Sequence, residues 1–439
     1  GSGLGFRECP QAGESINHHE RGTAMERNAE SLGDLIAPLS IEDFFASCWE
    51  KTFLHLQNEP GRWSEYFSSR DIDSWLASVR SGLPDSIMIT APEGAEARTD
   101  RYRPQEISVE TAYAALARGC SLVLNHMEDW PPFLGLVKAL GRELHADIGV
   151  NAYLTPKGAR TFPIHTDEHD TLILHLEGEK IWRLHEFSVL QLPIPQKKNL
   201  KFSQEWYGRT QTPQLAEIRL KPGDVLYIPR GMPHYAVAQD SACLHLTISI
   251  TPLYWMDFLK IAAEHAAIHS QAVRRALPPG FVDSEEICER MRQTFQEVMK
   301  TFQEVTSFDE VLAAVKRNRV AFQSYPSDGH FANLLAPGEL TIDSEVERRR
   351  DILCVVDEVF DHDRNTKMAI WFARQQVTGP LHLRGALEFI RDHARFQVSE
   401  IPGLDEKGQL TLTRRLITEG LLRRVPASKL VEVPEPAVP

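Results

Sequence analysis

The six cysteines of this 439-residue chain are widely separated, and no two of them form a CxxC pair. Without such pairs the sequence offers neither a thiolate zinc site nor a compact disulfide framework. This use of cysteine is typical of a reducing compartment, so we expect a cytoplasmic protein. Any metal ion would have to be bound by histidine and carboxylate side chains.

A long apolar run is also missing. No segment approaches the roughly 20 consecutive apolar residues that a membrane-spanning helix needs. The N-terminus is polar through about residue 30 and lacks the apolar core of a signal peptide. We therefore expect no membrane association. We interpret residues 1–30 as the remnant of an added tag followed by a disordered leader.

Positive charge is scarce: 48 Lys and Arg stand against 61 Asp and Glu, for a formal net charge of −13. Affinity for phosphate backbones comes from clustered Lys and Arg, so this balance argues against direct nucleic-acid binding. A basic partner would suit the chain better. We interpret the basic run at residues 348–350 as a solvated face or an ion-pair stretch.

The length predicts two or three domains, and the sequence pattern changes along the chain. Residues 31–150 mix helical and strand patterns. Residues 151–252 indicate short strands separated by Gly- and Pro-containing turns, which predicts an all-β barrel or a double-sheet sandwich. The expected strands lie at residues 170–176, 181–184, 225–228, 234–237 and 242–250.

After Pro252 the pattern becomes helical, and we expect the strands to stop until a short one at residues 420–425. The expected helices lie at residues 255–276, 285–312, 383–394 and 410–419. Two helices followed by a short strand at the C-terminal end are typical of a winged helix.

The most informative segment is His165-Thr166-Asp167, followed much later by His234. Residues i and i+2 of an extended strand point to the same side, so His165 and Asp167 can face one metal ion. Two imidazoles and one carboxylate form the ligand set of non-haem Fe(II) oxygenases. Zinc hydrolases use a similar set, but usually through a helical HExxH pair, which this sequence lacks. The pattern predicts an Fe(II) site at His165, Asp167 and His234.

Lys180 connects this metal site to a cosubstrate. It follows a predicted hairpin turn at residues 177–179 and begins an otherwise apolar strand. A buried lysine without a partner is costly, so Lys180 should meet a carboxylate. The C5 carboxylate of 2-oxoglutarate, bound to iron through its other end, would be that partner. The alternative is a lysine that reaches the surface beside Trp182.

Longer motifs surround these residues. They comprise Trp49-Glu50-Lys51 and residues 151–156, 165–167, 176–183, 222–231 and 274–281. Together they resemble the JmjC ribosomal oxygenases, the bacterial and nucleolar protein hydroxylases of the cupin superfamily. The resemblance covers roughly residues 35–430.

The resemblance implies an α+β multidomain protein. Residues 31–255 would form a JmjC/cupin double-stranded β-helix, residues 256–335 a helical dimerisation domain, and residues 336–439 a winged-helix-like domain. A homodimer is therefore expected, and the winged helix would serve as a structural or protein-contact module.

By position, the resemblance assigns His165, Asp167 and His234 to Fe(II) and Lys180 to 2-oxoglutarate. It also implies that two polar residues, Asn151 and Tyr153, line the cosubstrate pocket. We interpret the other histidines of the strand region as structural residues or as supports for the ligands. These histidines are His169, His175, His185 and His245.

One position departs from the family pattern. Nucleolar members carry an arginine near the substrate in a C-S-x-R pattern, and Val123 stands at that place in this chain. The chemistry at iron is untouched by this change, but it argues against transferring the ribosomal substrate directly.

These features predict a 2-oxoglutarate-dependent dioxygenase that uses O2 to hydroxylate a side chain of a protein or peptide, resembling the ribosomal-protein hydroxylases. Two other classes stay open. The same chemistry can act on a natural-product precursor peptide, a free amino acid or a methyl-lysine. A non-catalytic cupin that binds a metal or a partner is the other alternative, and Lys180 counts against it because a binding module needs no cosubstrate lysine.

Overall fold

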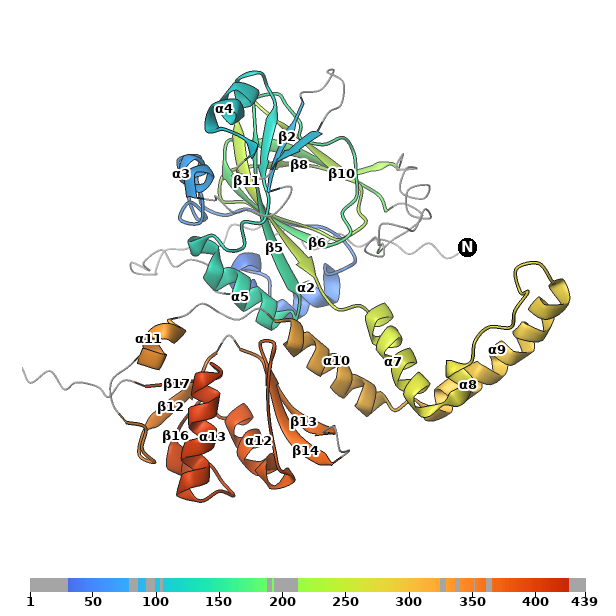
Figure 1. Ribbon diagram of the computed structural model, residues 1–439. Coiled ribbons are helices and arrows are strands. Elements are labelled where there is room, and N and C mark those ends of the chain that lie inside the picture. The colour runs from blue at the N-terminus through green and yellow to red at the C-terminus, as the bar shows by residue number, and fades with distance from the viewer. Residues whose placement is uncertain are drawn as a thin grey trace, which may run out of the picture. The chain divides into compact units, whose positions relative to one another are not determined.

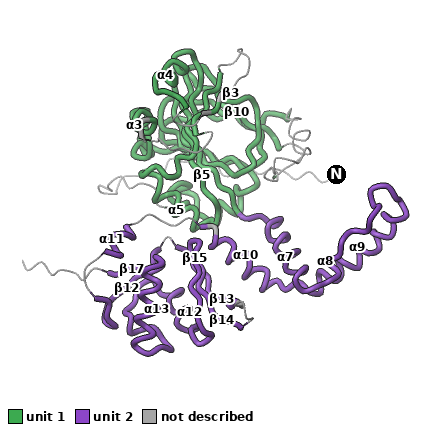
Figure 2. The backbone as a smooth tube through the Cα atoms, viewed as in Figure 1, with its two compact units in different colours: residues 1–252 green, residues 253–439 purple. Residues whose placement is uncertain are grey.

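The computed structural model describes residues 31–78, 86–91, 99–102, 106–187, 192, 212–323, 329–335, 339–350, 352–360 and 365–425. The chain divides into two compact units, residues 1–252 and residues 253–439 (Figure 2). The expected tag and leader at residues 1–30 lie outside the described part.

Unit 1 is built on two antiparallel sheets (Figure 1). The larger has the strand order β1-β9-β6-β11-β5-β4-β2-β3, and the smaller has the order β10-β7-β8. The strands are β1 (Leu54–Leu56), β2 (Ile87–Thr90), β3 (Thr99–Tyr102), β4 (Ser121–Leu124), β5 (Asp147–Thr155), β6 (Asp170–Glu177), β7 (Lys180–His185), β8 (Gln214–Leu220), β9 (Val225–Ile228), β10 (His234–Ala238) and β11 (Cys243–Thr251). The strands predicted between residues 170 and 250 are all present, and the double-sheet prediction is confirmed.

The alternation of side chains along β6 shows how the sheets are packed. Leu172 and Leu174 point into one core cluster, while Ile173 between them belongs to another. That second cluster contains Trp182 and Leu184 from β7 of the smaller sheet. Because successive side chains of a strand point to opposite faces, β6 is buried on both sides. The space between the two sheets is thus one of the interiors of unit 1.

Helices contribute to the other core of the larger sheet. They are α1 (Leu32–Ile36), α2 (Ile41–Ser47), α3 (Asp71–Ser78), α4 (Val109–Ala117), the 3-10 turn η2 (Pro131–Phe133) and α5 (Leu134–Glu143). Phe44 of α2, Ala115 of α4 and Leu136 of α5 are buried in this core. Ser40 caps α2, because its side chain accepts a hydrogen bond from the Asp43 amide.

Two predicted turns require glycine. Gly178, between β6 and β7, has φ +69°, and an added Cβ would lie 2.3 Å from the carbonyl oxygen of Ala242. Gly223, before β9, has φ +98°, and its Cβ would lie 2.3 Å from the carbonyl oxygen of Glu59. Any other residue would be strained at both positions and would also collide with the backbone. The first turn sets the position of Lys180 at the start of β7.

Unit 2 combines helices with two small sheets. Its helices are α7 (Trp255–His269), α8 (Gln271–Arg274), α9 (Glu285–Val305), α10 (Phe308–Phe322), α11 (His330–Leu335), α12 (Arg384–Asp392) and α13 (Glu406–Thr418), with 3-10 turns η3 (Leu381–Leu383) and η4 (Val398–Glu400). The sheets are β16-β12-β17 and β13-β14-β15. Their strands are β12 (Glu345–Arg348), β13 (Cys354–Phe360), β14 (Thr366–Phe372), β15 (Gln375–Gly379), β16 (Arg395–Gln397) and β17 (Leu422–Arg424).

Three expectations for this half were wrong. The single helix expected at residues 255–276 is two helices, because extended backbone at Ser270 separates α7 from α8. Strands do not stop after Pro252, since β13 and β14 pair over seven residues. They are rich in Val, Ile and Phe, as strand formers are, and this signal was missed. The single helix expected at residues 285–312 is two helices, because Ser307 caps a new one by accepting from the Glu310 amide. None of the helices described in either unit is both long and apolar enough to cross a membrane.

Candidate metal centre

A backbone bridge outside the regular strands brings the predicted ligands together. The His165 amide donates to the His234 carbonyl at 3.1 Å, and the His234 amide donates to the His165 carbonyl at 2.8 Å. The Gly231 amide also donates to the Asp167 carbonyl at 2.9 Å. Asp167 lies in an irregular segment, so the expected regular strand through both residues of the pair was wrong. Pairing with the chain around His234 aligns them instead.

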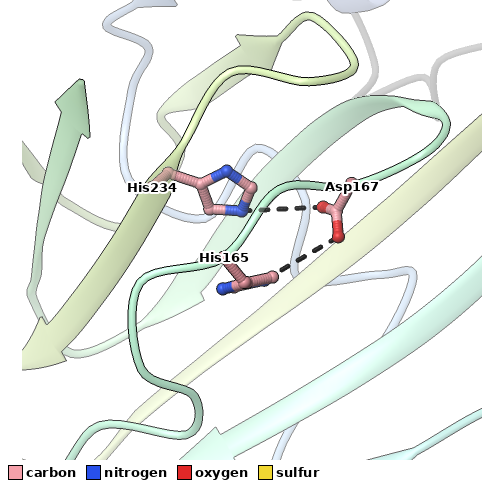
Figure 3. A group of neighbouring side chains, drawn as sticks. All are labelled: His165, Asp167 and His234. Atoms are coloured by element: carbon pink, nitrogen blue, oxygen red, sulfur yellow. Dashed lines mark ion pairs between the residues drawn. The ribbon is translucent and has the colours of Figure 1, made fainter. Parts of the chain in front are cut away.

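The imidazole tautomers are set by backbone carbonyls. Nδ1 of His165 lies 2.9 Å from the Pro163 carbonyl oxygen, and Nδ1 of His234 lies 2.9 Å from that of Met232. A carbonyl can only accept, so each Nδ1 donates and each Nε2 keeps a free lone pair. These Nε2 atoms face the Asp167 carboxylate at 3.7 Å and 3.6 Å (Figure 3).

The charge states of this group also suit metal binding. Burial, and secondly the neighbouring His165, lower the pKa of His234 to about 4, so its imidazole is neutral near pH 7. Burial raises the pKa of Asp167, but the charges of the nearby histidines outweigh this effect and hold the pKa below its usual value. One potential ligand atom from each of the three residues lies within 4.8 Å of the others. Two imidazoles that each present Nε2 and an ionised carboxylate fit Fe(II).

A cavity of about 340 Å³ opens beside these ligands, and Lys180 lines it. The Lys180 side chain is only 2% exposed, so the alternative in which it reaches the surface was wrong. Its Nζ donates to the Thr155 hydroxyl at 3.0 Å, and no carboxylate is paired with it among the described residues. Burial lowers the pKa of Lys180, because the ammonium has lost its hydration.

Asn151 and Tyr153 also line the cavity, both on β5. The Tyr153 ring is stacked on His245, with ring centroids 4.8 Å apart and an interplanar angle of 7°. Burial raises the pKa of Tyr153, so its hydroxyl stays protonated and available as a donor. Val123 is fully buried on β4 directly opposite Tyr153, so it stands on the same face of the sheet.

The other histidines do not belong to the converging group of three. His169 lines the cavity, and its Nδ1 lies 3.2 Å from the Thr171 hydroxyl. His175 donates to the Gly178 carbonyl at 3.0 Å, and His185 to the Thr212 carbonyl at 2.8 Å. These contacts fit their interpretation as structural residues. Further cavity residues that the sequence reasoning did not single out are Thr161, Phe162, Pro163, Thr171, Trp182, Tyr235, Ala236 and Thr247.

A buried polar network behind the loop that leads to His234 was also missed. The Tyr227 hydroxyl donates to Asp170 at 2.6 Å, and Arg230 donates to Glu50 at 2.6 Å. The Glu50 amide in turn donates to the Tyr227 oxygen at 3.0 Å. Trp49 stacks on Tyr227, so the early Trp49-Glu50-Lys51 element supports this loop. Only the family motif pointed to it, because the partners are too distant in sequence for any spacing rule.

Comparison with known proteins agrees with this geometry. Residues 134–258 match the family model described as the JmjC domain. The chain is 27% identical over 338 residues to the bifunctional lysine-specific demethylase and histidyl-hydroxylase NO66 of Aedes aegypti, covering 73% of this chain and 52% of the relative. It is 30% identical over 270 residues to ribosomal oxygenase 1 of Homo sapiens, covering 60% and 41%. The chain therefore spans about half of these relatives or less.

A solved structure extends the likeness in fold. The crystal structure of ycfD from Escherichia coli matches with a TM-score of 0.50 at 15% identity, covering 88% of this chain and 98% of that one. At this identity the likeness concerns the fold alone. The expected resemblance to the JmjC ribosomal oxygenases is confirmed, and so is the JmjC/cupin fold of the strand-rich unit.

If the three converging side chains bind one ion, removing any one of them should weaken binding of that ion. We expect His234→Ala to weaken Fe(II) binding about tenfold or more, since even outer partners of a metal site contribute that much. His145→Asn removes an exposed imidazole elsewhere in unit 1, away from the cavity, and should leave binding unchanged. Anaerobic equilibrium dialysis with metal analysis measures both. Equal losses in the two variants would contradict the assignment of ligands.

Proposed function

We propose that this chain is an Fe(II)- and 2-oxoglutarate-dependent dioxygenase that hydroxylates a side chain of a protein or peptide. The observation that carries the proposal is Lys180, a buried lysine facing the same cavity as His165, Asp167 and His234. Among the described residues, the ammonium contacts the Thr155 hydroxyl and lies 5.9 Å from the centre of the Trp182 ring, but it has no carboxylate partner. Such burial is costly, so this arrangement is explained best by an anionic ligand. The names of the curated relatives, an oxygenase and a hydroxylase, agree with it.

In this proposal each part of the cavity has a separate task. His165, Asp167 and His234 hold Fe(II), with Nε2 of each imidazole kept free by the backbone contact at Nδ1. Bound there with 2-oxoglutarate and O2, iron supplies the chemistry that oxidises an unactivated C–H bond. Lys180 binds the far carboxylate of 2-oxoglutarate and so orients it.

The walls of the cavity complete the binding site. Asn151 and Tyr153 contribute polar side chains from β5. Phe162, Trp182 and the stacked pair of Tyr153 and His245 supply apolar surface that excludes water. A dry cavity strengthens the ion pair at Lys180 and protects the reaction from side products.

The substrate we favour is a side chain of a basic protein or peptide, as in ribosomal proteins. The names of the relatives and the net charge of −13 support this class. Val123 makes a different contact from the arginine of the nucleolar proteins, so we expect the recognised sequence to differ from theirs. A precursor peptide, a free amino acid or a methyl-lysine remains an alternative outcome.

Mass spectrometry tests the function directly. We expect the Fe(II)-loaded protein, given 2-oxoglutarate, O2 and a library of basic peptides and ribosomal proteins, to release succinate and form products about 16 Da heavier. Asp167→Ala is the control and should form none. A product that has lost a methyl group would identify demethylation instead. Iron binding without succinate release on any substrate would contradict an enzyme and favour a binding module.

The role of Lys180 predicts a specific kinetic effect. Lys180→Ala leaves a cosubstrate carboxylate without its partner, at a cost of about 3–5 kcal/mol for a fully buried pair. The apparent 2-oxoglutarate requirement should therefore rise roughly a hundredfold or more, with Fe(II) binding unchanged. Lys157→Ala, an exposed lysine of the same unit, serves as the matched control. A succinate-release assay over a range of 2-oxoglutarate concentrations decides, and an unchanged requirement excludes this role.

We further propose that residues 256–335 form a helical dimerisation domain and residues 336–439 a winged-helix-like protein-contact module. In support, α9 buries none of its residues and leaves Phe295 and Met299 58% and 38% exposed. The helices α12 and α13 and the sheet β16-β12-β17 fit the second assignment.

We propose that the helical dimerisation domain joins two copies of the chain into a homodimer. Light scattering of the full chain should give the mass of a dimer, and Phe295→Asp should shift it toward the monomer, because a carboxylate is costly to bury. Thr294→Asp, the adjacent exposed position, should keep the dimer. A monomeric parent protein would refute the proposal.

A further inference from the structure

A second group of metal-binding side chains lies in unit 2, where α7 packs against α10. It consists of His265 and His269 from α7 and Glu310 from the first turn of α10, and we name it the α7–α10 cluster. One potential ligand atom from each residue lies within 4.8 Å of the others. Nε2 of His265 is 2.5 Å from Oε2 of Glu310, and the two imidazole centroids are 4.5 Å apart.

The local structure holds these three side chains in place. Residues four apart share one face of a helix, which puts both imidazoles above the same neighbour. Phe258 of α7 and Phe308 of α10 pack with ring centroids 5.5 Å apart, which fixes the two helices against each other. Ser307 caps α10 and so places Glu310 in its first turn. The packing of the two helices and the cap of α10 therefore position the three side chains, independently of the contacts among them.

An ion pair alone does not account for the cluster. Glu310 is 63% exposed at its side chain, and such a surface pair contributes little to stability. The His265 side chain is 12% exposed, and its Nδ1 is buried without a hydrogen-bond partner in the described part of the chain. The imidazole is thus held through Nε2, the atom that points at the carboxylate. The exposed His269 adds a third potential metal ligand, which the ion pair of His265 and Glu310 does not require.

We propose that the α7–α10 cluster binds one divalent transition-metal ion of the zinc class. Imidazole and carboxylate ligands together favour Zn(II) or Ni(II) over Mg(II) and Ca(II), which prefer oxygen ligands alone. Two histidines four apart on a helix are a recurring zinc-binding pair, and a glutamate from elsewhere completes the set of three. Water would occupy the fourth position.

The role of such an ion is a cross-link between helices and not hydrolysis. In the HExxH pair of zinc peptidases, the residue after the first histidine is the glutamate that serves as general base. Here that residue is Ala266, which is fully buried and has no group able to carry a proton. The ion would connect α7 to α10 and stabilise the folded form of unit 2. This inference does not depend on the proposed oxygenase function.

Zinc binding to the full chain tests the proposal once the centre in unit 1 is removed. The parent for this experiment is the double variant His165→Ala/His234→Ala. Competition with a chromophoric zinc chelator should show one equivalent of Zn(II) bound per chain. Adding His269→Ala or Glu310→Gln should weaken that binding about tenfold or more. Glu264→Gln, which removes an exposed carboxylate from the same helix, should leave it unchanged.

Thermal unfolding gives a second measurement that separates ligand loss from misfolding. Zn(II) should raise the melting temperature of the double variant and of its Glu264→Gln form, but not of the His269→Ala or Glu310→Gln forms. Without zinc, all four proteins should melt at similar temperatures. A double variant that binds no zinc, or zinc affinity that survives both ligand substitutions, would overturn the proposal.

Discussion

The backbone pairing of His165 with His234 is the contact on which the candidate metal centre depends. These residues come from segments on either side of the β6–β9 region, and neither segment would present its side chain correctly alone. The bridge sets the distance between the imidazoles, and the neighbouring contact from Gly231 to Asp167 adds the carboxylate. Because the bridging bonds are backbone bonds, substitutions of nearby side chains alter the cavity more easily than the ligand geometry.

The second constraint is the buried charge at Lys180. The hairpin at Gly178 forces this lysine to begin β7, where it lies between the two sheets and away from water. The Thr155 hydroxyl and the Trp182 ring compensate only in part for the lost hydration, so the folded protein carries a site that an anion would stabilise. Stability and ligand affinity are linked at this position. The free-energy cost of burying the Lys180 ammonium is relieved when a carboxylate binds beside it. The site therefore favours a cosubstrate with a second carboxylate at that position.

Support for the centre comes from distant parts of unit 1. Glu50 and Arg230 are paired across 180 positions of sequence, and Tyr227 and Asp170 extend the contact to the start of β6. Burial raises the pKa of Asp170 to about 6, because its carboxylate has lost contact with water. The hydrogen bond from Tyr227 and the charge of Arg230 stabilise the ionised form instead. A loop anchored in this way keeps His234 in position, as metal ligands require. In unit 2, the packing of Phe258 against Phe308 and the Ser307 cap place the α7–α10 cluster.

The sequence by itself determined the strands from residue 170 to 250, their glycine turns and the residue types of the triad, because these depend on local alternation and on backbone conformations that few residues adopt. It identified Lys180 as an unusual charge in an apolar strand, and the family motifs then supplied the architecture. It missed β13 and β14 and the break before α10, where strand and cap signals were overlooked. Only the tertiary structure decided that His165 pairs with His234, that Lys180 stays buried, and that Glu50 supports the loop. Those outcomes depend on contacts between distant segments, which no spacing along the chain specifies.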